Sequence, residues 1–370
     1  MKKVKKHWVF IAVLTAAMVL ITTACPTGGS GPSGSGPTAS GFYGPDGKKI
    51  DGITTLLAAV AYMNDTANDA GEYVYVAGAD ESVEGTTQDR IITRAGNSLT
   101  LKGTGAGQTI TKSGNGFLLG VQSGVTLILD EKITLEGHSG NSNSLVQIGG
   151  GTLEMKTGSK ITGNTTTYGG GVGVFSNGGG GVFIGGTFTM SGGEITGNTA
   201  DDSGGGVYVQ DSSVTFTMTG GSITGNTTST TGGGGVHISF GCTFTMSGGD
   251  ITDNTAKVNG GGVYVQTSAF TMSGGSITGN TASNGGGGGV YVQNSSAFTM
   301  SGGSITGNAA NGGGGLGIGG GVLMDGGTFT MNTPATQASI KDNIATGPTP
   351  QVHVYSGTVD GTAGVPGTGW

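Results

Sequence analysis

Cysteine is almost absent from this chain: Cys25 and Cys242 are the only two in 370 residues. Two cysteines cannot build the disulfide framework that holds many small secreted domains together. The fold is therefore expected to be held by periodic hydrogen bonding and packing.

Basic side chains are also scarce, with 15 Lys and Arg against 22 Asp and Glu. Four of the lysines, Lys2, Lys3, Lys5 and Lys6, lie at the extreme N-terminus, and without them the balance is 11 − 22 = −11. The remaining basic residues are scattered and form no patch that would release counterions from phosphates. Nucleic acid and anionic lipid surfaces are therefore not expected as partners.

Glycine, in contrast, is abundant: 83 glycines and 8 prolines approach the Gly plus Pro level of about 25% that indicates low complexity when no period is present. Here a period is present. The phrase I-T-x-N recurs at spacings of 34, 28, 28, 26, 28 and 35 residues. Such a period predicts a solenoid. Its asparagines are Asn164, Asn198, Asn226, Asn254, Asn280, Asn308 and Asn343.

Three short strand phrases, of the types V-Y-V, F-T-M and S-I-T, occur in each regular repeat, which predicts three strands per coil and a triangular cross-section. Successive strand residues face opposite sides, so the Phe and Met of F-T-M share the inner face. We expect an all-β parallel β-helix of about ten coils, stacked about 4.8 Å apart. The predicted inner columns are Phe188, Phe216, Phe244, Phe270, Phe298, Phe329 and Met190, Met218, Met246, Met272, Met300, Met331.

The glycines and asparagines are predicted to form the corners of each coil. Glycine adopts positive φ and permits close approach of a neighbouring coil, which explains S-G-G after F-T-M and G-G-G before V-Y-V. The asparagine of I-T-x-N, repeated at one corner, is expected to hydrogen-bond to the amides above and below it as a structural ladder.

The chain divides into five predicted segments. Residues 1–24 read as an export signal, with lysines, an apolar stretch and small residues before Cys25. Residues 25–41, rich in Gly, Ser and Pro, are expected to form a flexible tether. Residues 42–71 are a predicted N-terminal cap with a short helix around Ile53 to Met63, N-capped by Thr54 or Asp51. Residues 72–345 carry the repeats, and 346–370 a C-terminal cap or tail.

Two stretches resemble known families. "LITTAC" resembles a bacterial lipobox, although Thr22 stands where an aliphatic residue is usual, and this resemblance implies lipidation of Cys25 and attachment to a membrane. Secretion with cleavage nearby is the alternative. "ITGNTA" followed by "GGGVYV", over residues 90–345, resembles the repeats of chlamydial polymorphic outer-membrane proteins and, more closely, glycine-rich repeat lipoproteins of treponemes.

The second resemblance implies a right-handed parallel β-helix displayed at a bacterial outer membrane or cell surface, with adhesion as a common role. This sequence departs from the chlamydial pattern with isoleucine for phenylalanine and G-G-G-V for G-G-A-I. No C-terminal run of alternating, membrane-length strands follows the repeats, so the lipid on Cys25 is expected to serve as the anchor.

We therefore expect a non-enzymatic, monomeric surface lipoprotein that binds a host or matrix protein or glycan, without cofactor or metal. Its possible binding face is an exposed column of aromatic rings in the V-Y-V strands, with His237 at the equivalent place in one coil, although the rings could simply cover polar surface. The column consists of Tyr208, Tyr264 and Tyr291.

Two other functions remain open. A polysaccharide lyase or hydrolase would need clustered acids or a basic residue in a groove. The regular coils offer Glu194 two coils before Asp250, and Asp253 at the position of Asp342, which are more simply solvated corner residues. An ice-binding face would use the outward threonines of T-F-T, but Ala269 and Ala297 interrupt that row.

Overall fold

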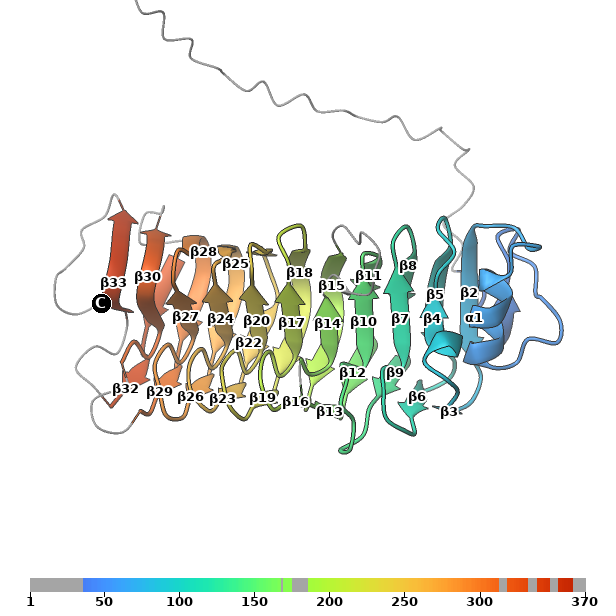
Figure 1. The fold of residues 1–370 in the computed structure, drawn as a ribbon, viewed down its shortest axis with the longest axis horizontal. Coiled ribbons are helices and arrows are strands. Elements are labelled where there is room, and N and C mark those ends of the chain that lie inside the picture. The colour runs from blue at the N-terminus through green and yellow to red at the C-terminus, as the bar shows by residue number, and fades with distance from the viewer. Residues whose placement is uncertain are drawn as a thin grey trace, which may run out of the picture. The chain divides into compact units, whose positions relative to one another are not determined.

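The computed structural model describes residues 36–167, 169–174, 186–312, 318–331, 338–346 and 352–361, without the side chains of Val174 and 355–361. The predicted export signal, Cys25 and most of the tether lie outside these residues. The described part is almost entirely β-structure, wound into a parallel β-helix (Figure 1). Within it, no helix combines the length and apolar character needed to cross a bilayer.

The F-T-M face is the longest stack of the solenoid. Its strands join in ten successive parallel pairings, in agreement with the prediction of about ten coils. The strands are β2 (Glu72–Ala77), β5 (Ser98–Gly103), β8 (Thr126–Leu129), β11 (Thr152–Met155), β21 (Thr243–Met246), the first halves of β15 (Thr187–Thr196), β18 (Thr215–Thr224), β25 (Ala269–Thr278) and β28 (Ala297–Thr306), and the second halves of β30 (Val322–Met331) and β33 (Val352–Gly361).

The S-I-T face follows the S-G-G corner, which the long strands β15, β18, β25 and β28 cross without a break. Its core residue is the isoleucine, for example Ile223 and Ile251, both fully buried. The other strands of this face are β3 (Glu81–Val83), β6 (Gln108–Lys112), β9 (Ile133–Glu136), β12 (Ser159–Thr162), β22 (Asp250–Thr252) and β31 (Ala338–Lys341).

The V-Y-V face closes each coil and is turned toward the viewer in Figure 1. Its two valines point inward, since Val207 and Val209 are fully buried. The strands are β4 (Ile91–Ile92), β7 (Leu119–Gln122), β10 (Val146–Gly149), β14 (Val172–Val174), β17 (Val207–Gln210), β20 (Val236–Ser239), β24 (Val263–Gln266), β27 (Val290–Gln293) and the first halves of β30 and β33.

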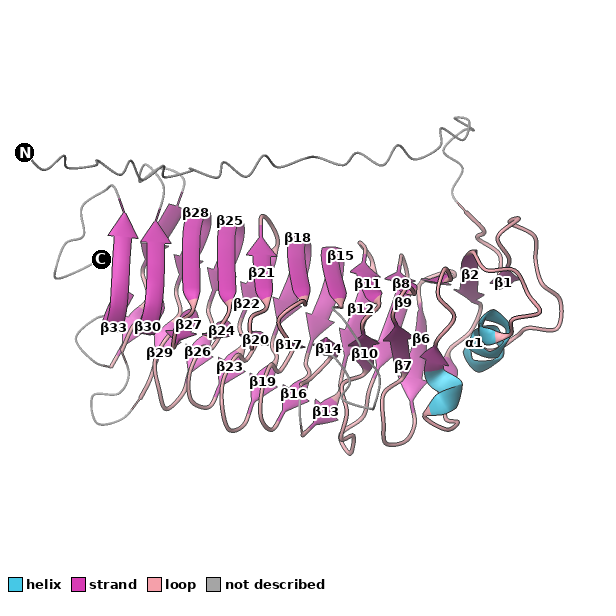
Figure 2. Cartoon of the chain, turned by 45° about the horizontal axis from the view of Figure 1, so that its top comes forward, coloured by secondary structure: helices cyan, strands magenta, loops and turns pink. Residues whose placement is uncertain are grey.

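A fourth, narrow sheet lies at the corner between the S-I-T and V-Y-V faces, which a simple triangle does not contain (Figure 2). Each of its strands has two residues and directly follows the asparagine of I-T-x-N. These strands are β13 (Thr165–Thr166), β16 (Thr199–Ala200), β19 (Thr227–Thr228), β23 (Thr255–Ala256), β26 (Thr281–Ala282), β29 (Ala309–Ala310) and β32 (Ile344–Ala345).

The core has the predicted inner columns. The six phenylalanines stack with nearly parallel rings, their centroids 4.5–5.0 Å apart, which is the spacing of neighbouring strands. Five of the six methionines beside them are fully buried, and Met331 in the last complete rung is half-buried. Each coil therefore buries its apolar side chains against the next coil as well as within itself.

The N-terminal cap contains the predicted helix, α1 (Leu56–Asn64), which lies across the end of the stack (Figure 2). Its N-cap is Thr55, whose Oγ1 accepts from the N–H of Ala58 at 3.3 Å, so the prediction of Thr54 or Asp51 was wrong. The first edge of the F-T-M face is covered by β1 (Gly41–Tyr43), which pairs antiparallel with β2. A 3-10 helix, η1 (Gln88–Arg90), precedes β4.

Candidate functional site

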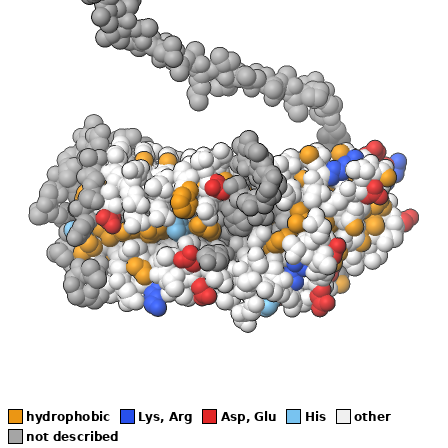
Figure 3. Space-filling model, viewed as in Figure 1, with side chains coloured by type: hydrophobic (Ala, Val, Ile, Leu, Met, Phe, Trp, Pro, Cys, Tyr) orange, Lys and Arg blue, Asp and Glu red, His pale blue; other side chains and the backbone are white. Residues whose placement is uncertain are grey.

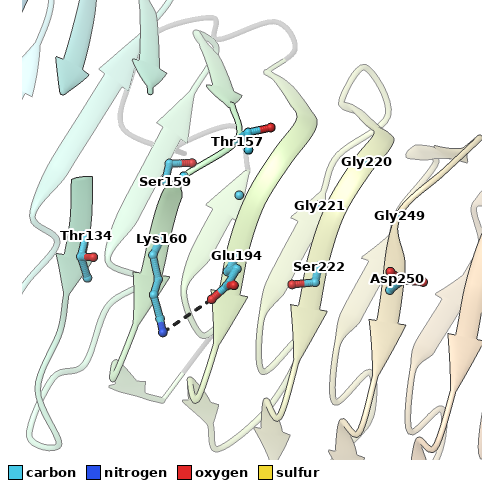
Figure 4. A pocket seen from close by; sticks show the side chains of 12 residues that line it. Thr134, Thr157, Ser159, Lys160, Glu194, Gly220, Gly221, Ser222, Gly249 and Asp250 are labelled. Carbon is cyan, nitrogen blue, oxygen red and sulfur yellow. Dashed lines mark ion pairs between the residues drawn. The ribbon is translucent and has the colours of Figure 1, made fainter. Parts of the chain in front are cut away.

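A groove runs along the corner between the F-T-M and S-I-T faces and spans five coils, from Thr134 of β9 to Asp250 of β22 (Figure 4). One outward row supplies its most variable side chains: Lys160 of β12 pairs with Glu194, Glu194 with Ser222, and Ser222 with Asp250 of β22. These residues precede the buried isoleucine of the S-I-T phrase, so strand alternation turns them outward. We call this row, with the glycines beside it, the variable-row groove.

The floor of the variable-row groove is the glycine corner S-G-G. Gly221 has a φ of +83°, and a Cβ on it would lie 2.6 Å from the carbonyl oxygen of Gly192 in the preceding coil. Only glycine fits there, because other residues rarely adopt positive φ and the neighbouring backbone leaves no space. The hollow has a volume of about 600 Å³ and is lined by hydroxyl, carboxylate and backbone groups.

The charges of the groove are an ion pair and a separate carboxylate. Lys160 Nζ lies 3.6 Å from Glu194 Oε2, and both side chains are about half exposed, so the pair adds little stability. Asp250 is exposed and lies two coils beyond Glu194, about 9.6 Å away at the usual strand spacing. The register of the paired strands thus confirms the prediction that Glu194 and Asp250 lie in one row, two coils apart.

Asp253 and Asp342 do not belong to this row. They share the x position of I-T-x-N, where their φ values are +54° and +57° and other coils have glycine. Aspartate tolerates this left-handed conformation better than most residues. Their role at the corner is therefore conformational.

The tyrosine column of the V-Y-V face differs from the prediction of an exposed binding face. Tyr264 and Tyr291 are only 8% and 4% exposed, and Tyr208 is half-buried. The glycine-rich segments that lead into each V-Y-V strand pass over the rings: a Cβ on Gly232 would lie 2.8 Å from Tyr264 Cδ2. Figure 3 shows a narrow line of hydrophobic side chains along this face, and the low exposure of Tyr264 and Tyr291 means that most of each of these two rings is covered.

The hydroxyl groups of this column are engaged within the protein. The Tyr291 hydroxyl donates to Asp325 Oδ2 at 2.7 Å, and those of Tyr208 and Tyr264 donate to Gln210 and Gln293. Burial raises the pKa of Tyr264 to about 12 and also raises the pKa of the other two phenols. The three rings therefore act as an outer packing layer and offer little surface to a partner.

His237 takes the place of a tyrosine in one coil, packed edge-to-face between Tyr208 and Tyr264 at centroid distances of 5.3 and 4.5 Å. It is 4% exposed, and neither ring nitrogen has a hydrogen-bond partner within the described residues. Burial lowers the pKa of this imidazole to about 3, partly opposed by the nearby Gln266 side chain. His237 is therefore neutral at physiological pH.

The seven repeated asparagines lie buried in one column. From Asn198 to Asn308, each side-chain amide donates to Oδ1 of the next asparagine at 2.9–3.1 Å, and the backbone N–H reaches the same oxygen. The ladder begins one coil earlier than the I-T-x-N phrase, because Asn141 Nδ2 donates to Asn164 Oδ1 at 2.7 Å. Asn141 stands in "EGHSGN", which has no repeat signature.

The other candidate residues do not converge on a site. Cys242 is buried, its Sγ within 3.0 Å of the Asp211 and Ser239 carbonyl oxygens, and burial raises its pKa to about 12. Of the two outward threonine rows considered for ice binding, one is interrupted by Ala269 and Ala297. The other is unbroken and consists of Thr189, Thr217, Thr245, Thr271, Thr299 and Thr330. Across the described ranges, no three His, Cys, Asp or Glu side chains gather as metal ligands would.

Residues 180–358, slightly less than half of the chain, match the family model of a right handed beta helix region. Together with the parallel solenoid, this match shows that the fold is a right-handed parallel β-helix, as predicted. The family includes adhesin-like and carbohydrate-active members. No curated protein and no solved structure matches the chain.

Proposed function

We propose that this protein is a non-enzymatic surface rod, anchored through a lipid on Cys25, that binds a host or matrix ligand in the variable-row groove. The observation that carries this proposal is the contrast between the core and the groove. In the regular coils Phe, Met, Ile and Asn recur at equivalent inward positions, whereas one outward row reads Thr, Lys, Glu, Ser and Asp over five coils before it becomes serine in the next three. Packing does not require this variation, so recognition is the simplest reason for it.

The groove suits an extended, polar ligand. Its row contributes one donor cation, two carboxylates and hydroxyl groups at intervals of about 4.8 Å along the rod. The glycine floor lets a chain of the ligand approach the protein backbone closely. A glycan or an extended polypeptide of a matrix protein would meet these requirements. This assignment replaces the tyrosine column, whose rings are mostly covered.

Binding to a panel of purified matrix proteins and glycans would test the proposal. Asp250→Lys reverses a charge in the groove, and we expect it to weaken binding at least about tenfold, or about 1.4 kcal/mol. Thr271→Lys, on the F-T-M face outside the groove, is the matched control and should bind like the wild type. Equal loss in both variants, or none in Asp250→Lys, would contradict the proposed site.

Surface attachment can be tested separately. Labelling of intact cells with a membrane-impermeant reagent should mark the wild-type protein, whereas a Cys25→Ala variant should lose lipid incorporation and be released into the medium. Retention of the variant at the surface would show that another element holds the rod.

A carbohydrate-active enzyme is the second candidate, favoured by one observation. Glu194 and Asp250 lie in one groove on strands about 9.6 Å apart, a backbone spacing comparable to the roughly 6.5–9.5 Å that separates the two carboxyl groups of inverting glycosidases. Incubation with a polysaccharide panel, with and without calcium, would decide between the candidates. Turnover that disappears in both Glu194→Gln and Asp250→Asn, but not in Asp325→Asn, would establish the enzyme.

A further inference from the structure

Two basic side chains are buried in the irregular N-terminal coils, in the two coils that precede Thr134 at the start of the variable-row groove. Arg90, at the end of η1, and Lys112, at the end of β6, are each only 2% exposed. None of the ion pairs within the described residues includes either of them. The carboxylates of Asp89 and Glu84 act on Arg90 and Lys112 from a distance but do not pair with them directly. A buried charge without a directly paired opposite charge is costly, so this pair of cations requires an explanation.

The protein partners of these two cations are few. Arg90 Nη1 donates to the carbonyl oxygens of Glu84 and Gly85 at 2.9 and 2.5 Å, and its guanidinium lies over the ring of Phe117. Its Nε is buried and has no partner within the described residues. Lys112 Nζ has one contact, at 3.5 Å from the carbonyl oxygen of Val83. Part of the hydrogen-bonding capacity of both cations is therefore unused within the described residues.

Both cations reach the same loop, residues 113–116, with the sequence Ser-Gly-Asn-Gly. A Cβ on Gly116 would lie 2.9 Å from Arg90 Nη2, and a Cβ on Gly114 would lie 3.6 Å from Lys112 Nζ. Apart from the adjoining residues of the chain, the ammonium nitrogen of Lys112 is the only described atom within 4 Å of such a Cβ on Gly114. Space therefore remains between Gly114 and the ammonium group. The guanidinium and the ammonium thus lie under one short loop.

The loop also carries unused backbone donors. The N–H groups of Gly114 and Asn115 make no hydrogen bond within the described part of the chain, whereas the N–H of Gly116 donates to Asn141 Oδ1. Backbone amides in glycine-rich turns commonly bind anions together with basic side chains. A planar guanidinium, an ammonium and two amides are the donors that a tetrahedral oxyanion accepts from.

We propose that Arg90, Lys112 and the loop of residues 113–116 form a binding site for a tetrahedral oxyanion, phosphate or sulfate, either free or as a monoester on a sugar. The anion supplies a directly paired negative charge, which neither cation has within the described residues, and its oxygens accept from Arg90, Lys112 and the loop amides. Burial, and the charge of Arg90, lower the pKa of Lys112, and a bound anion would raise it again. The site does not depend on the function proposed for the groove.

Thermal unfolding and calorimetric titration of the purified full chain would test this site with inorganic phosphate, inorganic sulfate and glucose 6-phosphate. Chloride at matched ionic strength is the reference. We expect phosphate or sulfate to raise the unfolding temperature above that in chloride, because a ligand that binds only the folded state stabilises it. Stronger binding of glucose 6-phosphate than of free phosphate would assign the site to a monoester, and weaker binding would assign it to the free ion.

Lys112→Met should lose the anion effect, with affinity reduced at least about tenfold, or about 1.4 kcal/mol. Lys102→Met is the matched control, because Lys102 lies on the neighbouring strand and pairs with Asp130 at 3.3 Å. Gly114→Ala, which fills the space above the ammonium and keeps both cations, should also weaken binding. No preference for oxyanions over chloride in the wild type, or equal binding by Lys112→Met, would overturn the proposal.

Discussion

Asn226 and Asn254 are joined by two hydrogen bonds to one oxygen: Oδ1 of Asn254 accepts from the backbone N–H of Asn226 at 2.9 Å and from its Nδ2 at 3.0 Å. Asn254 repeats both bonds with Asn280 in the next coil. The Oδ1 atoms of the ladder thus face the N-terminal end of the rod, while each Nδ2 donates both forward to the next asparagine and back to an isoleucine carbonyl of the preceding coil. Each rung fixes the register of the next, since a slipped coil would lose all its amide partners.

Asn254→Ala is expected to destabilise the solenoid by at least about 3 kcal/mol. The change leaves two donors of Asn226 without their acceptor and removes the donor to the Ile223 carbonyl oxygen, and each orphaned buried group costs about 1–3 kcal/mol. The midpoint of guanidinium unfolding measures the loss, and hydrogen exchange of the neighbouring coils locates it.

Asn284→Ala provides the control for this ladder variant. Asn284 lies in the corresponding corner region of the next coil, but its side chain is exposed. Its replacement should change the free energy of unfolding by less than about 0.5 kcal/mol. Similar effects of the two substitutions would show that the ladder is not a source of stability.

The periodic part of this fold could be predicted from the sequence, and the part that depends on irregular segments could not. Strand alternation in F-T-M places Phe and Met inside, and the structure has both columns there. The burial of Tyr264 depends instead on the path of a glycine-rich loop over its ring, and no periodicity describes that path.

The candidate sites show the same division. The row that contains Glu194 and Asp250 follows from counting repeats, because equivalent positions stack in register. The groove beside it could not be predicted, since its depth arises from how the S-G-G corner bends. Arg90 and Lys112 lie in coils without the repeated phrases, so the sequence offered no signal that a loop would bury both.

Interrupting the phenylalanine stack is expected to lower the free energy of unfolding substantially. Phe244→Ala should destabilise the protein by about 3–5 kcal/mol, because a cavity would open between the rings of Phe216 and Phe270, which lie 4.5 and 4.7 Å away. Phe240→Ala is the control four residues earlier, since Phe240 is 56% exposed and should contribute within about 0.5 kcal/mol. Chemical unfolding of both variants compares the two sites, and an equally small loss at Phe244 would contradict the packing role of the stack.

Because Asp253 has a left-handed backbone conformation, we expect protein stability to depend on the shape of the side chain at this position. Asp253→Val should destabilise the protein by about 1–2 kcal/mol, because a β-branched residue is strained at a φ of +54°, and Asp253→Gly should be neutral or stabilising. Asp250→Val, three residues earlier in β22, is the matched control and should change stability by less than about 0.5 kcal/mol. Equal losses from the two valine variants, measured by thermal unfolding, would refute the conformational role of Asp253.

His237 predicts how stability depends on pH. Its pKa is about 3 in the folded protein and about 6.5 in an unfolded chain, so between these values the unfolded state binds more protons. The contribution of the neutral imidazole is therefore complete above about pH 6.5, and is lost as the pH falls toward 3 by at most about 1.4 kcal/mol per pH unit. Unfolding midpoints measured from pH 7 to pH 4 should decline accordingly.

His237→Tyr isolates this contribution, because tyrosine occupies the equivalent position in β24 and β27 and does not titrate in this range. The variant should show a flatter stability profile between pH 6.5 and 4, while other acids still contribute to any remaining slope. An unchanged slope in His237→Tyr would mean that the imidazole remains accessible to protons in the folded rod.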